Sequence, residues 1–138
     1  MRYLLWAFLA LVAYTLVPSL VKLATAEIPS DVVLLISNSI LVIVAAGIVL
    51  VSDVSVTPYL TEQRAVYAYG AGIALTVGIA SYYRALAGGP VSVVVPIFGM
   101  FIATSSIIGI AFLDEPLTAR KVVGIALAVL AVYLTSVE

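Results

Sequence analysis

Polar and proline residues stand within or at the ends of long apolar runs, and nine of them are the candidates for chemistry in this chain. In apolar surroundings a charged or strongly polar side chain needs a partner or water, so such residues mark either a polar pathway or a contact between helices. We select as candidate pathway residues Tyr14, Pro18, Lys22, Asn38, Thr76, Tyr83, Arg84, Pro96 and Ser106.

Spacing places several of these residues on common helix faces. Tyr14, Pro18 and Lys22 follow one another at four-residue intervals, which puts them on one side of a helix. Pro18 lacks a backbone N–H and is expected to kink that helix. Lys22 and Arg84 stand near the ends of apolar runs, so extension toward the lipid headgroups explains them equally well.

The other polar side chains leave two interpretations open. Serine and threonine hydroxyls also bond to carbonyls of their own helix, which would give Thr76 and Ser106 a local role. The amide of Asn38 needs partners for both of its ends. For this residue we keep a bond between helices and a cavity contact as alternatives.

The chain offers little that an enzyme or a metal site requires. All its carboxylates lie in or beside expected turns, and they are Glu27, Asp31, Asp53, Glu62, Asp114, Glu115 and Glu138. A proton relay built on an acidic residue in mid-membrane is therefore unsupported. Histidine and cysteine are absent, and no nucleophile–base pair or phosphate-binding loop is present. We expect no catalytic residue, no metal and no cofactor, and the net charge of −1 argues against a nucleic-acid partner.

Composition identifies the surroundings as lipid. The 138 residues are 64% hydrophobic and 9% charged, and their mean hydropathy is +1.29. A soluble domain usually carries about 25% charged residues. Apolar runs of about 20 residues match the hydrocarbon thickness of a bilayer. We therefore expect a multi-pass protein of the cell membrane, with the lipid bilayer as its main partner.

The elements that position the candidate residues are five expected transmembrane helices. An open chain in lipid satisfies its backbone only as α-helices, so the expected fold class is all-α. All five helices belong to one expected domain, 1–138, and span approximately 3–23, 32–52, 64–86, 91–113 and 120–137. An odd number of spans puts the termini on opposite sides of the membrane. Lysines and arginines divide four to two in favour of the N-terminal side, a small bias toward a cytoplasmic N-terminus.

Small residues form a stripe on the last expected helix. Close packing drives helix association in lipid, so small side chains mark contacts. The stripe is the candidate dimer seam, although packing within the chain explains it equally well, and it consists of Gly124, Ala128, Ala131 and Thr135.

The C-terminal part of the chain resembles one EamA-type half of the drug/metabolite transporter superfamily. The likeness is strongest from Tyr82 to Leu134: Tyr82-Tyr83-Arg84-Ala85-Leu86, a Gly/Pro turn, Pro96 in the next helix, and the acidic turn Phe112-Leu113-Asp114-Glu115-Pro116-Leu117-Thr118. The family pattern at this turn is usually F-L-G-E-x-L-T. Asp114 replaces its glycine, while Glu115, Leu117 and Thr118 match it.

The resemblance implies one half of a ten-helix, inverted-repeat transporter that moves small metabolites by alternating access. In such proteins the first, third and fourth helices of each half tend to line the cavity, which implies wall positions for Tyr14, Pro18, Lys22, Tyr83 and Pro96. The last helices tend to join the halves, which implies a seam at Gly124.

A five-helix unit of this family needs a second half. An antiparallel homodimer is the simplest expectation, and a heterodimer with an oppositely oriented partner is the alternative. Lys22 and Arg84 from both copies favour small anionic or zwitterionic solutes, including amino-acid-like ones. The alternatives to transport by such a dimer are a non-transporting membrane scaffold or subunit, and a small-multidrug-type exporter. The exporter requires a carboxylate in the first helix, and this chain has none there.

Overall fold

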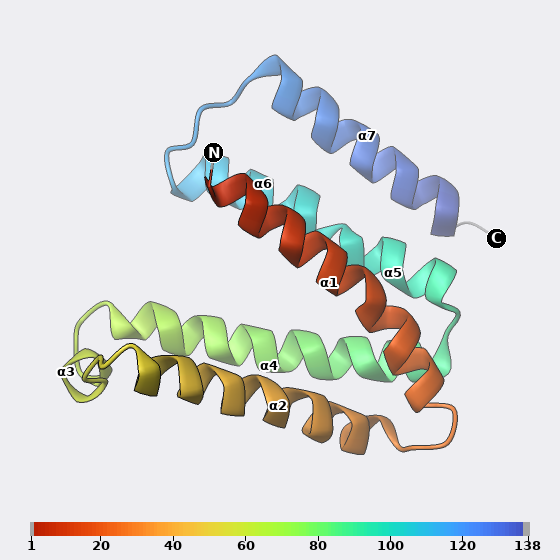
Figure 1. Cartoon of the computed structure of the whole chain (residues 1–138). Helices are drawn as coiled ribbons and strands as arrows, with labels where there is room; N and C mark the ends of the chain where they lie inside the picture. Colours follow the sequence, from red (N-terminus) through yellow and green to blue (C-terminus); the bar gives the residue numbers. More distant parts are fainter. Residues whose placement is uncertain (1, 137–138) are drawn as a thin grey trace. The chain divides into compact units, whose positions relative to one another are not determined.

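The chain folds into α-helices that follow its hydrophobic runs (Figure 1). The computed structural model describes residues 2–136, and no strand occurs within that range, which confirms the all-α class. The helices are α1 (Arg2–Ala24), α2 (Ser30–Val51), α3 (Thr57–Leu60), α4 (Ala65–Gly88), α5 (Val91–Gly99), α6 (Phe101–Phe112) and α7 (Ala119–Ser136).

Four stretches among the described residues are helical, long enough and apolar enough to cross a membrane. They are Tyr3–Ala24, Ser30–Val51, Ala65–Gly88 and Val91–Phe112, the last of which contains both α5 and α6. The fifth expected span, 120–137, corresponds to α7, which is helical but is not among these four. Its expected end, residue 137, lies outside the described residues, so the fifth span stays a prediction.

The fourth expected helix, 91–113, differs from the prediction because it is interrupted at Met100. The Met100 N–H donates to the Ile97 carbonyl, three residues back, at 3.2 Å, which is the tighter pattern of a 3₁₀ turn. Pro96 stands one turn before the break, within α5. A proline inside a helix removes one backbone bond and crowds the preceding turn, which explains an irregularity at this point.

The chain forms two compact units, Met1–Gly88 and Gly89–Glu138. The two glycines at the boundary suit a break in the helix, and each unit is described by itself below. Whether the two units form the single five-helix domain that the sequence predicts is not decided by either unit alone, so the single domain stays a prediction.

In the first unit, α4 packs against both α2 and α1. Buried side chains gather where α1 and α4 end and α2 begins: they are Pro18, Val21, Val33, Tyr82, Tyr83 and Leu86. The connection between α2 and α4 contains the short helix α3, and the Tyr69 hydroxyl donates to the carbonyl of Leu60 at its end. The core of this unit is therefore at one end of its helices.

In the second unit, α7 packs against α5 and α6. Ala103 and Gly109 of α6 are buried, so small residues permit the close approach. Between α6 and α7, Asp114 adopts a φ of 54°, in the left-handed region that glycine occupies most easily. This geometry explains why the family pattern has glycine at the position of Asp114.

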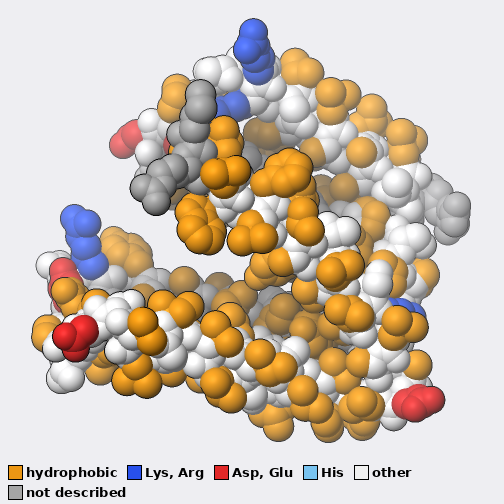
Figure 2. Space-filling view, in the orientation of Figure 1, with side chains coloured by type: hydrophobic (Ala, Val, Ile, Leu, Met, Phe, Trp, Pro, Cys, Tyr) orange, Lys and Arg blue, Asp and Glu red, His pale blue; other side chains and the backbone are white. Residues whose placement is uncertain are grey.

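Apolar side chains cover the outside of the helices. Leucine, isoleucine and valine side chains are exposed along α1 and α2, including Leu5 at 73% and Ile43 at 70%. Hydrophobic atoms dominate the face shown in Figure 2, and the charged groups on that face lie toward helix ends. A helix that is apolar all round requires apolar surroundings, which agrees with a lipid environment.

Candidate functional site

Polar side chains form three separate contacts between helices of the first unit. We call this group the helix-end cluster and define it as Lys22 of α1, Asp31 and Ser37 of α2, and Tyr83 and Arg84 of α4. Three of its members, Lys22, Tyr83 and Arg84, are among the predicted pathway residues. Each of them joins α4 to α1 or α2, because α1 and α4 end where α2 begins.

Lys22 binds the C-terminal end of α4. Its Nζ donates to the carbonyl of Leu86 at 2.9 Å and to that of Ala87 at 3.4 Å. The last carbonyls of a helix lack intrahelical donors. The donor that would serve Leu86 belongs to residue 90, which is a proline and has no N–H. The ammonium group therefore replaces a backbone donor that the sequence removes.

Tyr83 links α4 to α2 through its hydroxyl. Its ring is 4% exposed, and its Oη lies 3.0 Å from the Oγ of Ser37. The Ser37 hydroxyl also lies 2.8 Å from the carbonyl of Val33, one turn earlier in α2. A serine has one hydroxyl hydrogen, so when Ser37 donates to this carbonyl the tyrosine donates to Ser37.

Arg84 forms an ion pair with Asp31 on the outside of the cluster. The Nη2 and Oδ1 atoms are 3.2 Å apart, and the two side chains are 67% and 69% exposed. Asp31 is in the first turn of α2, where a carboxylate also suits the helix dipole. The pair joins the start of α2 to the end of α4, beside Tyr83.

The remaining predicted residues of the first unit are distributed along its helices. Asn38 is half-buried and donates from Nδ2 to the carbonyl of Leu34 at 2.8 Å, with Ser37 Oγ at 3.5 Å. Pro18 is buried in α1, one turn before Lys22. Tyr14 is 67% exposed, and the Thr76 hydroxyl bonds to Gly72 in its own helix. Asn38 thus adjoins the helix-end cluster, whereas no contact places Tyr14 or Thr76 in it.

Thr76 instead lines a shallow depression on one face of α4. The depression has a volume of about 470 Å³ and is lined by Ala68, Tyr69, Gly72, Ile73, Thr76 and Val77. All of these residues belong to α4, and the small side chains at positions 68 and 72 create the hollow. A depression on a single helix provides a packing surface and does not enclose a solute.

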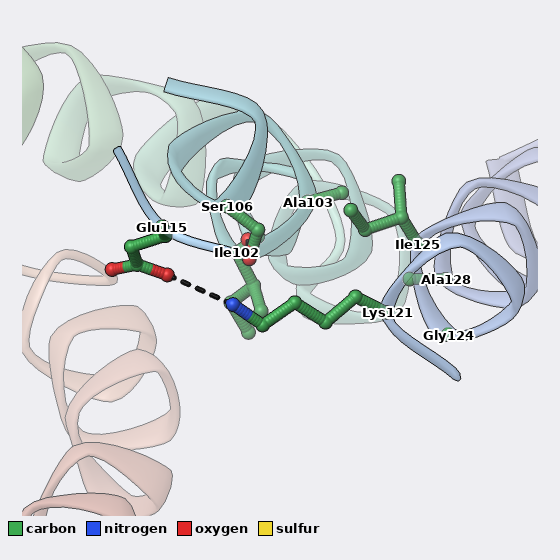
Figure 3. A pocket seen from close by; sticks show the side chains of 8 residues that line it. All are labelled: Ile102, Ala103, Ser106, Glu115, Lys121, Gly124, Ile125 and Ala128. Atoms are coloured by element: carbon green, nitrogen blue, oxygen red, sulfur yellow. Dashed lines mark hydrogen bonds and ion pairs between the residues drawn. The ribbon is translucent and has the colours of Figure 1, made fainter. Parts of the chain in front are cut away.

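The second unit contains a pocket between α6 and α7 (Figure 3). Its volume is about 230 Å³, and it is lined by Ile102, Ala103, Ser106, Glu115, Lys121, Gly124, Ile125 and Ala128. In Figure 3 the Lys121 side chain extends from α7 toward Glu115, and Nζ lies 3.1 Å from Oε2. The walls are otherwise mainly apolar, so the ion pair supplies most of the polarity of the pocket.

The α6–α7 pocket contains residues from both groups of predictions. Ser106, a predicted pathway residue, lies in its wall and bonds to the Ile102 carbonyl at 2.8 Å. Gly124 and Ala128, from the candidate dimer seam, face the same pocket. Ala131 and Thr135 continue the stripe as exposed residues of α7, and Pro96 is half-buried in α5. At Gly124 an added Cβ would meet no atom within 4 Å in the described structure, so the seam stays a prediction.

Sequence reasoning missed three residues that the fold uses. Ser37 neighbours the predicted Asn38, but its pairing with Tyr83 spans 46 positions and has no local signal. From the sequence, Asp31 was expected only to lie in a turn, and its ion pair with Arg84 was not predicted. The partner of Lys22 did have a signal, because Pro90 stands four residues after Leu86 and leaves its carbonyl without a backbone donor.

The chemistry available to these groups is hydrogen bonding and ion pairing. In the part of the chain from 2 to 136, no three acidic side chains come close enough to hold a metal ion. The half-buried Lys22 ammonium and the Tyr83–Ser37 hydroxyls are suited to bind polar groups of a solute or of a neighbouring helix.

Comparison with known proteins supplies one match. The model of the EamA-like transporter family matches residues 1–137. The comparisons with curated proteins and with solved structures find no match.

Proposed function

Since this chain belongs to the EamA-like transporter family, within the drug/metabolite transporter superfamily, we propose that it moves small metabolites across the cell membrane. The observation that carries the proposal is the family match over nearly the whole chain. The four candidate spans and their exposed apolar side chains support a multi-pass position in the bilayer. A family of this kind indicates transport and gives no support to an enzymatic activity.

We propose that two copies of the chain assemble in opposite orientations. Each copy supplies one EamA-type half, and the solute passes between the halves by alternating access. The small excess of basic residues on one side supports this proposal because a weak bias permits insertion in both directions. The exposed end of the α7 stripe, at Ala131 and Thr135, is available for contact between copies.

We further propose that the solute is anionic or zwitterionic and amino-acid-like. Lys22 supports this choice because it places an ammonium group at the half-buried end of α1, against the last turn of α4. A carboxylate is the natural partner for such a cation. Arg84 contributes less, since Asp31 already pairs with it.

A non-transporting membrane subunit is the second candidate, and one observation favours it. Both predicted cations bind groups of their own chain, Lys22 at α4 carbonyls and Arg84 at Asp31. Such contacts suffice for a protein that only packs against a partner. The two candidates differ in whether purified protein moves a solute.

The transport test uses the purified protein in liposomes. Vesicles loaded with unlabelled amino acids are diluted into a mixture of ¹⁴C-labelled L-amino acids, and retained label is compared with protein-free vesicles. We expect label to accumulate by exchange. Retention equal to that of empty vesicles, by protein that is folded and dimeric, would favour the non-transporting subunit.

The orientation test uses the absence of cysteine from the sequence. Glu27→Cys and Glu62→Cys introduce thiols into connections on opposite predicted sides of the membrane. A membrane-impermeant maleimide applied to intact cells should label both variants partially, relative to permeabilised cells. Complete labelling of one variant and none of the other would exclude the antiparallel homodimer and leave an oppositely oriented partner protein as the second half.

A further inference from the structure

We infer that Lys22 exchanges partners during transport, binding the end of α4 when no solute is present and the carboxylate of the solute when one is. This inference rests on the proposed function and names the chemical group that the site recognises. It also couples solute binding to the packing of the helices, because the solute would displace a contact between α1 and α4.

Lys22 donates to a carbonyl at the end of α4. The residue four positions after Leu86 is Pro90, which has no N–H to donate, and the Lys22 ammonium group lies 2.9 Å from the Leu86 carbonyl oxygen. Leu86 itself is fully buried, at 0% exposure, so leaving its carbonyl without a donor is unfavourable. The arrangement therefore holds Lys22 in place through bonds to neutral carbonyl oxygens.

The carbonyl oxygens that Lys22 binds are weaker acceptors than a carboxylate. Hydrogen bonds between an ammonium group and a carboxylate are shorter and stronger than bonds to neutral acceptors. The second carbonyl, that of Ala87, is 3.4 Å from Nζ, which is long for a hydrogen bond. A solute carboxylate thus offers Lys22 stronger bonds than the neutral carbonyls of Leu86 and Ala87 do, whereas a neutral amide offers no such advantage.

Lys22 binds the end of the helix that also carries Tyr83 and Arg84. Lys22 is half-buried at the end of α1, where the chain enters a polar turn, so the ammonium group is reachable from that end. Tyr83 is one turn before Leu86 in α4 and carries the hydroxyl that bonds to Ser37. Displacing Lys22 from Leu86 would release the last turn of the helix that holds Tyr83 and Arg84.

The experiment measures competition in the liposome exchange assay. Unlabelled L-alanine and L-alaninamide, which differ in the carboxylate, are compared as inhibitors of uptake of the ¹⁴C-labelled amino-acid mixture. For the natural chain we expect alaninamide to inhibit more weakly by about tenfold to a hundredfold, the range for a hydrogen bond to a charged group. In Lys22→Met we expect the two compounds to become equal, and in Lys22→Arg the preference to persist. Arg120→Met, which removes an exposed cation from α7, should keep the preference.

A second variant separates recognition from folding. Lys22→Met also removes the ammonium donor from the Leu86 carbonyl, so it is combined with Pro90→Ala, which gives residue 90 an N–H and allows α4 to extend until that group reaches Leu86. The double variant should recover thermal stability but not the preference for L-alanine. Recovery of both would overturn the inference, because Lys22 would then serve only the end of α4.

Three further outcomes are decisive. If Lys22→Met transports amino acids with the preference of the natural chain, the inference fails while the proposed transport function stands. If the natural chain exchanges amino acids but is inhibited equally by L-alanine and L-alaninamide, carboxylate recognition fails in the same way. If the natural chain moves none of the labelled amino acids, the result counts against the proposed solute class and the inference together.

Discussion

Gly109 and Glu115 approach so closely that a Cβ atom on Gly109 would lie 3.2 Å from the carboxyl carbon of Glu115. The same carboxylate binds Lys121 across the α6–α7 pocket at 3.1 Å, and the Glu115 N–H donates to the Gly109 carbonyl. The missing side chain at position 109 therefore leaves room for the ion pair. Glu115 belongs to the acidic turn that carries the family resemblance, and this contact gives the residue a structural role.

Gly109→Ala should weaken the hairpin of α6 and α7 by pushing Glu115 away from Lys121. Alanine also favours a helix over glycine by about 1 kcal/mol, so the proper control is a helical glycine without this neighbour. At Gly78, nothing in the described part of the chain lies within 4 Å of an added Cβ. We expect Gly109→Ala to be less stable than Gly78→Ala by about 1 kcal/mol, measured by unfolding in mixed micelles.

The same contact predicts a coupling between two substitutions. In a Glu115→Ala background the crowding disappears, so Gly109→Ala should then behave like the Gly78→Ala control. Equal effects of Gly109→Ala with and without Glu115 would show that the close approach costs nothing.

Asp114→Gly should stabilise the protein. Asp114 has a φ of 54°, a conformation that costs a residue with a Cβ more than it costs glycine. We expect a gain of about 0.5–1 kcal/mol in the free energy of unfolding, and a loss for Asp114→Ala. Asp53, with a φ of 51°, is the matched second site, where Asp53→Gly should act in the same direction. A loss of stability on both glycine substitutions would contradict this argument.

Ser37→Ala should cost more stability than Tyr83→Phe, although both remove the same 3.0 Å contact. Tyr83→Phe leaves Ser37 with its backbone acceptor at Val33. Ser37→Ala leaves the hydroxyl of Tyr83, a residue that is only 4% exposed, without its Ser37 partner. We expect losses of about 1 kcal/mol for Tyr83→Phe and about 2 kcal/mol for Ser37→Ala, compared by thermal unfolding of the single and double variants.

Arg84→Gln and Asp31→Asn should each change stability by less than about 1 kcal/mol, because both partners are largely exposed. Their double variant should differ little from either single one in the same unfolding assay. A loss of several kcal/mol on either substitution would mean that the pair is shielded from water in the assembled protein.

The local features of the fold were predictable because they depend on neighbouring residues. Long apolar runs without charge predict α1, α2 and α4, whose backbones are satisfied internally wherever they lie. The break of the fourth helix at Met100 was not predicted, because its position depends on how the turn after Pro96 tightens. The short helix α3 escaped prediction because four residues carry too little periodicity to reveal a helix.

The hydrophobic runs, the turns between them and the family motif are readable from the chain alone, since lipid imposes a simple rule on composition and length. The partners of the polar residues cannot be read from the chain in this way, because they are far apart in the sequence. Lys22 and Leu86 are 64 positions apart, and Ser37 and Tyr83 are 46 apart. Helical periodicity places each of these residues on a face of its own helix, but the packing of α1, α2 and α4 selects which faces meet. Only the folded chain therefore reveals that Lys22 takes the place of the N–H that Pro90 lacks.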